Sequence, residues 1–400
     1  MRNDATYEEV AVPALRWTLD PCGKHLNHGS FGAVPVAVQR EQQRLREVMD
    51  WNPVRWFSSL ATNIATARVQ MARLLDVPED TLAFVLNASA GASVVYQRLM
   101  DRGPAHVVVT NHGYGAVSMG AQRLAERTGG TFRTVDIPLD AKSDDVLALV
   151  GEAITAAPTT LLVIDQITSA TARAFPAREL CLLAREHGAQ SLVDGAHAPG
   201  VDPHPVCIDA DWWVGNFHKF VCAPRGTAML YSRDSDQALF PVIDSWGARD
   251  PFPARFDHTG TLDTTGWLVA PFAWQHLEDT IGWAEIRRRS AALADDAVGV
   301  LRGALEDLVD NPVPDVGMPV GPMRLLALPG GLGRTREEAD ALRVPFIDET
   351  GIALSFTSFG GVGYLRLSTH IYNAIEDYEY LAKVGVPLLH RWSIDSRRGA

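Results

Sequence analysis

The chain has 400 residues, of which 46% are hydrophobic and 21% charged, and its net charge at pH 7 is −12. This composition is typical of a globular protein long enough for a large core and a smaller second domain. The acidic balance and the scattered Arg and Lys argue against nucleic acid or a membrane surface as partners.

Neither a metal site nor a disulfide framework is indicated by the cysteines. The four cysteines lack CxxC spacing, which fits a reducing cytoplasm: Cys22, Cys181, Cys207 and Cys222. The first residues, MRNDATYEEVAVPALRW, are acidic where a signal peptide needs a basic region, and no apolar run approaches membrane-spanning length. We therefore expect a cytoplasmic protein.

Residues 1 to about 24 predict an irregular arm, and the glycine-rich turn LNHGSFGAVP leads from it into a helix over residues 36–50. LAFVLN then predicts a strand that turns at Ala88 and Ser89 into a helix. Free backbone N–H groups and the positive end of the helix dipole suit such a turn to binding phosphate, although Ser89 is also a common type of N-cap.

Strands and helices continue to alternate up to residue 194. HVVVT is followed by the turn NHGYGAV, where an aromatic ring could stack on a planar ligand or simply cover the core. TFRTVDI, TLLVID and SLVD are further strands, separated by helical segments. This alternation predicts an α/β fold with a mostly parallel sheet, whose ligands gather at the carboxyl ends of the strands.

Two charged residues lie at neighbouring strand ends. SLVD stops at Gly195, so Asp194 should face the crevice at the end of its strand, and Lys219 follows the strand WWVGN. Pyridoxal phosphate needs a lysine amine for covalent attachment and an acid that keeps its ring nitrogen protonated. Either residue alone is more often a helix cap or a solvated lysine, but together they predict this coenzyme.

After residue 231 the alternation stops. A segment rich in Pro and aromatic residues leads to GTLDTTGWLVAP, and one amphipathic helix is predicted from about Gln275 to Leu308. The remaining residues predict a mixed domain with strands MRLLALP, IALSF and GYLRLS, an intervening helix, and a final helix from about Ile375. Arg366 alternates with apolar neighbours in GYLRLS and so projects from one face of its strand.

The motifs DGAHAPG, NFHKFVCAPRG, LNHGSFGAVP and YLRLSTHIYN together resemble the fold type I pyridoxal-phosphate enzymes of the class V aminotransferase superfamily. Within it they are most similar to the isopenicillin N epimerase-like group, which is related to cysteine desulfurases. The resemblance implies an arm at 1–25, a large coenzyme domain at 26–275, a small domain at 276–400, and an obligate homodimer with shared active sites.

The resemblance also implies roles for individual residues. Lys219 and Asp194 would be catalytic. The residues implied to hold the coenzyme are Ala88, Ser89, Tyr114, Gln166, Ser169, Asp194, His197, Asn216, His218, Lys219 and Thr261, the last from the partner subunit. The residues implied to bind the substrate are Asn27, His28, Ser30 and Arg366, whose guanidinium would hold the α-carboxylate. The chain departs from the family by carrying Asn216 for Ser and Gln166 for His, and Gln cannot exchange protons.

The predicted chemistry starts with a carbanion at the Cα of an amino acid, and its outcome is open. C–S β-elimination from a cysteine S-conjugate is favoured, because the similar group includes hercynylcysteine sulfoxide lyases and antibiotic-pathway enzymes that process such conjugates. Decarboxylation with oxidative deamination and epimerisation remain alternatives. A persulfide-forming desulfurase is disfavoured, since SFTSFGGVGYLR contains no cysteine. A coenzyme-sensing regulator is disfavoured by the lack of a basic stripe.

Overall fold

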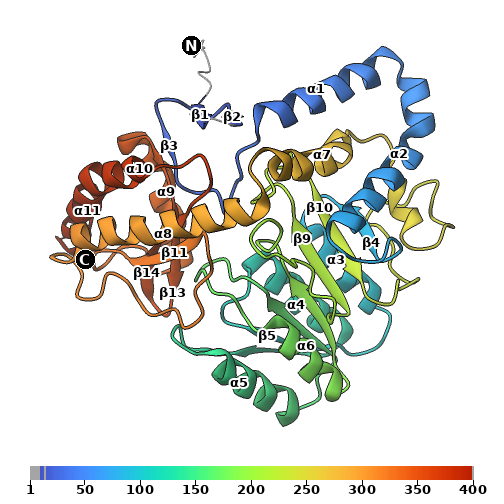
Figure 1. Cartoon of the computed structure of the whole chain (residues 1–400). Coiled ribbons are helices and arrows are strands. Elements are labelled where there is room, and N and C mark those ends of the chain that lie inside the picture. Colours follow the sequence, from blue (N-terminus) through green and yellow to red (C-terminus); the bar gives the residue numbers. More distant parts are fainter. Residues whose placement is uncertain (1–9, 13–14, 399–400) are drawn as a thin grey trace. The chain divides into compact units, whose positions relative to one another are not determined.

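The computed structural model describes residues 10–12 and 15–398 (Figure 1). The chain divides into two compact units: the described parts of 1–36, 170–173 and 280–400, and residues 37–169 with 174–279. The rest of the predicted arm, residues 1–9 and 13–14, lies outside the described residues. The domain boundaries implied by the resemblance stay predictions. Among the described residues, no helix has the length and apolar character to cross a membrane.

The second unit is built on a seven-stranded sheet with the order β4-β10-β9-β8-β7-β5-β6. Its strands are β4 (Leu82–Val85), β5 (His106–Thr110), β6 (Thr131–Val135), β7 (Leu161–Asp165), β8 (Gln190–Asp194), β9 (Trp212–Asn216) and β10 (Ala228–Ser232). Strands β6, β5, β7, β8 and β9 pair in parallel, whereas β10 is antiparallel to both of its neighbours. The predicted α/β fold with a mostly parallel sheet is confirmed.

Helices connect and cover these strands. They are α1 (Val36–Trp51), α2 (Pro53–Leu74), α3 (Ala88–Leu99), α4 (Gly115–Thr128), α5 (Ser143–Ala156), α6 (Ala177–Glu186), the 3₁₀ turn η1 (Ala254–Asp257) and α7 (Thr265–Thr280). Helix α3 packs on β8, β9 and β10, α4 on β5 and β6, and α6 on β7 and β8 (Figure 1). At Gly91 a Cβ atom would lie 2.6 Å from Val214 Cγ1, so glycine allows α3 to approach β9 closely.

The first unit contains a three-stranded antiparallel sheet with the order β11-β14-β13. Its strands are β11 (Met323–Ala327), β13 (Ser355–Phe359) and β14 (Val362–Ser368). Short strands pair as β1 (Val10–Val12) with β2 (Leu15–Trp17) and β3 (Lys24–His25) with β12 (Ile352–Ala353). The helical elements are α8 (Trp283–Leu305), α9 (Arg336–Thr350), α10 (Ile375–Tyr380), the π-helical turn η2 (Leu381–Gly385) and α11 (Val386–Arg398).

Two predictions about secondary structure were wrong. The arm is not irregular throughout its described part, because Leu15 and Trp17 belong to β2 and are buried. The helix predicted from Gln275 to Leu308 is two helices, since α7 ends at Thr280 and α8 begins at Trp283. Gly282 between them has a φ of +89°, a conformation that glycine adopts without strain and that cannot continue a helix.

Candidate active site

Asp194 is the last residue of β8 and is only 2% exposed. Its Oδ1 accepts a hydrogen bond of 2.9 Å from the backbone N–H of Ala196. Its Oδ2 is buried and has no hydrogen-bond partner among the described residues. Burial raises the pKa of Asp194, while the Ala196 N–H and the positive charge of Lys219 oppose this rise. The fold therefore presents a buried carboxyl oxygen that needs a donor from a ligand.

A second buried carboxyl group, Asp165, ends the neighbouring strand β7 and is paired in register with Asp194. Its Oδ1 accepts from the backbone N–H of Tyr114 at 3.2 Å, and the Ser169 backbone also donates to it. Burial raises the pKa of Asp165 well above its usual range, and the nearby charge of Asp194 adds to this. Burial and the charge of Asp194 thus favour the protonated form of Asp165 more strongly than burial favours that of Asp194.

Lys219 contacts His197 within the second unit. The Lys219 Nζ lies 3.1 Å from His197 Nε2, and His197 comes from the turn that directly follows β8. Because an ammonium group can only donate, Nε2 is the accepting nitrogen of the ring when Lys219 is charged. The structure thereby brings together Lys219, His197 and Asp194, three residues that the sequence predicts for one site.

The amino end of α3 lies against the end of β9. Asn216 Oδ1 accepts from the backbone N–H of Ala88 at 2.9 Å. The N-cap is Asn87, whose Oδ1 accepts from the Ala90 N–H at 2.8 Å, so Ser89 is not the cap. Ser89 therefore lies in the first turn, where backbone N–H groups lack helical partners. This arrangement suits Ser89 and Asn216 to an anionic ligand.

His218 is mostly buried and neutral. Burial, with the adjacent charge of Lys219, lowers its pKa from the usual 6.5 to about 4. Its Nδ1 lies 3.3 Å from the carbonyl oxygen of Thr227, which can only accept, so Nδ1 carries the proton. The other nitrogen, Nε2, could donate to a phosphate only after gaining a second proton, which the charge of a bound phosphate would favour.

Of the two aromatic residues in the turn after β5, Tyr114 is the better stacking candidate. Its side chain is 41% exposed at the start of α4. His112 is 1% exposed, and its Nε2 lies 3.0 Å from the carbonyl oxygen of Ile137. His112 is therefore part of the packed core, which supports Tyr114 as the ring that could stack on a planar ligand.

Gln166 is fixed by hydrogen bonds at both ends of its amide. Its Oε1 accepts from the indole N–H of Trp213 at 2.9 Å, and its Nε2 donates to Asp202 Oδ2 at 3.2 Å. At Gly195, a Cβ atom would lie 2.0 Å from Trp213 Nε1, so only glycine leaves room for this indole. Gln166 is thus a rigid, non-titrating group at the end of β7.

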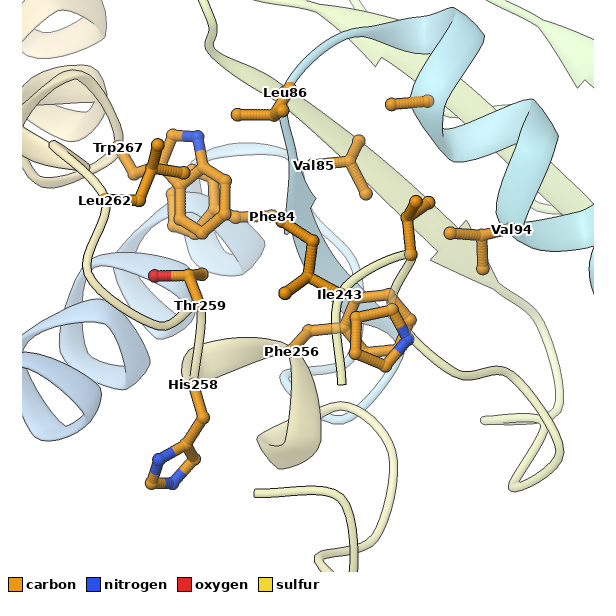
Figure 2. A pocket seen from close by; sticks show the side chains of 13 residues that line it. Phe84, Val85, Leu86, Val94, Ile243, Phe256, His258, Thr259, Leu262 and Trp267 are labelled. Atoms are coloured by element: carbon orange, nitrogen blue, oxygen red, sulfur yellow. The ribbon is translucent and has the colours of Figure 1, made fainter. Parts of the chain in front are cut away.

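An apolar pocket lies beside the turn that carries Ser89 (Figure 2). The segment 241–262 forms one wall, and the end of β4, the start of α3 and Trp267 form the rest. Its volume of about 70 Å³ is well below the ~150 Å³ of a cavity that holds benzene. The pocket is therefore too small for the coenzyme. Thr261, predicted to reach a partner's coenzyme, is exposed in the same segment.

In the first unit, the predicted substrate-binding residues gather around Arg366. The side chain of Arg366 on β14 is 2% exposed. Its Nη2 donates to Ser30 Oγ at 2.8 Å and to Asn27 Oδ1 at 3.3 Å. The alternative expectation of a surface-exposed arginine is wrong, because the side chain is buried and donates to Ser30 and Asn27.

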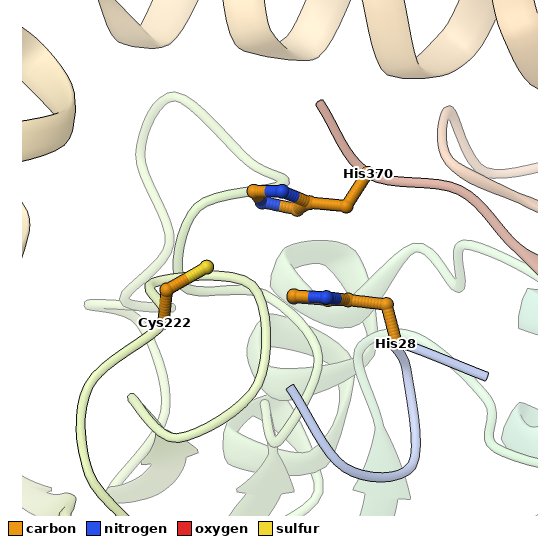
Figure 3. A group of neighbouring side chains, drawn as sticks. All are labelled: His28, Cys222 and His370. Carbon is orange, nitrogen blue, oxygen red and sulfur yellow. The ribbon is translucent and has the colours of Figure 1, made fainter. Parts of the chain in front are cut away.

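His28 extends this cluster. Its ring is stacked on that of His370, with centroids 4.1 Å apart and planes inclined by 16° (Figure 3). Its Nδ1 lies 2.9 Å from the hydroxyl oxygen of Tyr372. These contacts hold the His28 ring within the first unit, so a packing role accounts for it as well as substrate contact does.

Comparisons with known proteins identify the family. The model of the family described as Aminotransferase class-V matches residues 38–310. The chain belongs to this family. It is 29% identical to isopenicillin N epimerase from Amycolatopsis lactamdurans, covering 92% of this chain and 95% of that protein. It is 28% identical to L-cysteine desulfhydrase from Arabidopsis thaliana, covering 89% and 86% respectively.

The fold has a counterpart among solved structures. The apo structure of a cysteine desulfurase from Thermococcus onnurineus NA1 superposes with a TM-score of 0.72 over 92% of this chain and 94% of the other, at 18% identity. This class-V fold is the predicted fold type I architecture, so the recognition of the family and of the fold is confirmed.

The residues of this class-V chain fit the family's coenzyme, pyridoxal phosphate, which confirms the predicted cofactor. The buried Oδ2 of Asp194, which no described residue contacts by a hydrogen bond, suits a protonated pyridine nitrogen, and the turn of Ser89 suits its phosphate. Lys219 supplies the amine. The structure thus assembles these groups in one unit, while the individual roles of the predicted coenzyme residues stay predictions.

Two residues of the site were missed in the sequence. Asp165 ends TLLVID in the same way that Asp194 ends SLVD. The expectation that ligands gather at the carboxyl ends of parallel strands could therefore have identified it. Trp213 gave no signal, because in a buried strand its indole is indistinguishable from core. Its role is visible only from its hydrogen bond to Gln166.

Proposed function

We propose that this class-V enzyme is a lyase that cleaves the Cβ–S bond of a cysteine S-conjugate by β-elimination. The observation that carries the proposal is the contact of Lys219 with His197 in the same site as Asp194, whose Oδ2 has no hydrogen-bond partner in the described part of the chain. These groups provide the base and the buried acid that carbanion chemistry requires.

Lys219 is the proposed proton carrier at the substrate's Cα. Its amine must be uncharged to take that proton, and His197 Nε2 is placed to stabilise the charged form that results. His197 therefore both positions the amine and holds its proton until the leaving group requires one.

Asp194 is proposed to hold the coenzyme ring in its cationic form. When bound, pyridoxal phosphate supplies an electron sink that stabilises negative charge at Cα. The charge on Asp194 favours a proton on the ring nitrogen, since that proton satisfies the buried Oδ2. Asp165, whose pKa burial raises, accepts hydrogen bonds from the Tyr114 and Ser169 backbones and so helps to keep them in place.

Arg366 is proposed to bind the substrate α-carboxylate. Its planar guanidinium can bind a carboxylate through two parallel hydrogen bonds. Asn27 and Ser30 accept from its Nη2 and so fix the direction of the fork. Binding at this point fixes the amino acid by the group that every α-amino acid shares, which leaves the side chain to determine selectivity.

Two features favour elimination over persulfide formation and epimerisation. None of the four cysteines lies in the β13–β14 hairpin, so the hairpin offers no thiol to receive sulfur as a persulfide. Gln166 cannot act as a second base for epimerisation, and its amide is already bound to Trp213 and Asp202. The similarity to a cysteine desulfhydrase supports the same class of reaction.

We further propose a cytoplasmic homodimer in specialised metabolism, such as antibiotic biosynthesis, with Thr261 contacting the coenzyme of the partner. The exposed position of Thr261 supports this role. Size-exclusion chromatography with light scattering measures the assembly of wild type and Thr261→Ala, and titration of both apoproteins with the coenzyme, followed by absorbance, measures the coenzyme affinity.

Product analysis tests the reaction. Purified holoenzyme is given a panel of cysteine S-conjugates with and without oxygen. Elimination consumes one water and yields pyruvate, ammonia and a free thiol in equal amounts, independent of oxygen. Recovery of intact substrate carrying deuterium from D₂O at Cα would instead establish epimerisation, and a product without the carboxylate would establish oxidative decarboxylation. Lys219→Ala is the matched control.

A further inference from the structure

Two cysteines that are 26 positions apart in the sequence meet in the second unit. Cys181 lies in the middle of α6, and Cys207 lies in the loop between β8 and β9. Their Sγ atoms are 4.0 Å apart. Both are free thiols in the structure, as are Cys22 and Cys222. A disulfide needs the sulfurs about 2 Å apart, so the two side chains must move closer together before they can bond.

The loop of Cys207 is held on one face of α6. Arg178 Nε donates to Asp209 Oδ2 at 2.9 Å, and Arg185 Nη2 donates to the Asp209 carbonyl oxygen. Arg178 and Arg185 lie three residues before and four residues after Cys181, so all three share a face of the helix. The meeting of the two sulfurs is therefore built into the docking of the loop.

The two thiols differ in reactivity. Cys181 is 1% exposed, whereas Cys207 is partly exposed. A hydrogen bond from Cys181, together with the backbone N–H groups of Ala210 and Asp209, lowers the pKa of Cys207. The same contact and burial raise the pKa of Cys181. Cys207 is thus the more acidic and more accessible of the two thiols, and Cys181 is the shielded thiol beside it.

We propose that Cys181 and Cys207 form an oxidation site in which a peroxide oxidises Cys207 and Cys181 then closes a reversible disulfide. In the first step the Cys207 thiolate attacks hydrogen peroxide, the O–O bond breaks, and a sulfenic acid and hydroxide form. The hydroxide takes up the proton that the Cys207 thiol had released to solvent and becomes water. In the second step Cys181 Sγ attacks the Cys207 sulfur, the S–O bond breaks, and a second water leaves. A thiol reductant returns both cysteines to the reduced state.

Peptide mapping of the wild-type holoenzyme tests this proposal. The protein is treated with an equimolar amount of hydrogen peroxide, its remaining thiols are alkylated, and it is digested with trypsin without reduction. Trypsin places the two cysteines on separate peptides, 179–185 and 186–219. We expect a linked pair of these peptides, lighter than their sum by two hydrogen atoms and lost on treatment with dithiothreitol. Cys222, which is fully buried, stays an alkylatable thiol after denaturation.

Two variants separate the steps. Cys181→Ser removes the resolving thiol, so dimedone should trap the sulfenic acid on Cys207 in this variant and much less of it in wild type. Cys222→Ser is the matched control and should leave the linked pair unchanged. The proposal is overturned if Cys207 stays alkylatable while the exposed Cys22 is oxidised, or if oxidised Cys207 in wild type is not joined to Cys181.

Discussion

The clusters around Asp194 and Arg366 differ in how the fold holds a buried charge. In the second unit, an acidic side chain at the end of β8 is fixed by one backbone N–H, and its other oxygen is unpartnered among the described residues. In the first unit, a buried cation on β14 donates to the neutral oxygens of Asn27 and Ser30. The anion suits a cationic ring and the cation suits a carboxylate. Coenzyme chemistry and substrate recognition should therefore respond to different mutations.

The largest effect is expected at Lys219. Lys219→Ala removes the amine that is proposed to move the proton at Cα, so activity should fall by about 10²- to 10⁴-fold. The visible absorbance of the covalently held coenzyme should disappear as well. Lys219→Arg keeps the charge near His197 and serves as the control for folding. A Lys219→Ala enzyme with wild-type turnover would remove the basis of the proposed mechanism.

The two neighbouring carboxyls should behave very differently. Asp194→Asn removes the charge that is proposed to face the ring nitrogen and should lower kcat by about 10²- to 10³-fold. Asp165→Asn imitates the protonated carboxyl that burial favours, and its amide oxygen can still accept from Tyr114 N–H, so kcat should change little. Steady-state kinetics on both variants test which carboxyl acts on the coenzyme ring. Equal losses of kcat in the two variants would contradict the assignment of this role to Asp194.

Arg366→Lys should affect substrate binding rather than the coenzyme. A lysine cannot form two parallel hydrogen bonds to a carboxylate, so KM should rise by about 10- to 100-fold, the equivalent of one charged hydrogen bond. The coenzyme absorbance should be unchanged. If Arg366→Lys instead alters the spectrum and leaves KM unchanged, the assignment of substrate binding to the Arg366 cluster and of coenzyme binding to the Asp194 cluster is wrong.

A smaller effect is expected from His218 in the coenzyme-free protein. Because its folded-state pKa is about 4 and its usual value is 6.5, the unfolded chain binds the proton more readily. The stability that this residue contributes is therefore present above about pH 6.5 and is lost as pH falls through 4. Thermal unfolding as a function of pH should show a shallower acid loss in His218→Asn than in wild type.

The smallest effect is expected at the cap of α3. Asn87→Ala removes the acceptor for the Ala90 N–H and should lower the free energy of unfolding by about 1 kcal/mol. Asn87→Ser can still cap and should recover most of this. Urea denaturation measures both, and kcat should stay near the wild-type value because Asn87 is not among the proposed coenzyme contacts.

Local signals in the sequence were sufficient to predict much of the molecule. Short apolar runs bounded by glycine located the strands, and the position of Asp194 at a strand end predicted its place in the site. The contact between Lys219 and His197, by contrast, could not be predicted locally. It forms because the turn after β8 lies against the turn after β9, and no local sequence pattern encodes this. The same holds for Asn216, whose side chain binds a helix 128 residues earlier.

The errors in the prediction have physical causes as well. Hydrophobic periodicity runs unbroken from Gln275 to Leu308, but a single positive φ at Gly282 ends one helix and allows the next to begin. Periodicity reports which face is apolar and carries no information on such a dihedral angle. The nearness of Cys181 to Cys207 likewise depends on α6 docking against a loop, so sequence spacing could not reveal it.

The bond between Asn216 and the first N–H of α3 has a consequence for how the apoprotein matures. Asn216 lies three positions before Lys219, so this bond anchors the lysine-bearing turn to the start of α3, the proposed phosphate site, before any ligand arrives. The entropic cost of ordering that turn therefore arises when the chain folds and not when the coenzyme binds. Vitamin B6 in its phosphorylated form should therefore bind to a preformed site. The rate of reconstitution should then increase with coenzyme concentration and should not be limited by a slow rearrangement of the chain.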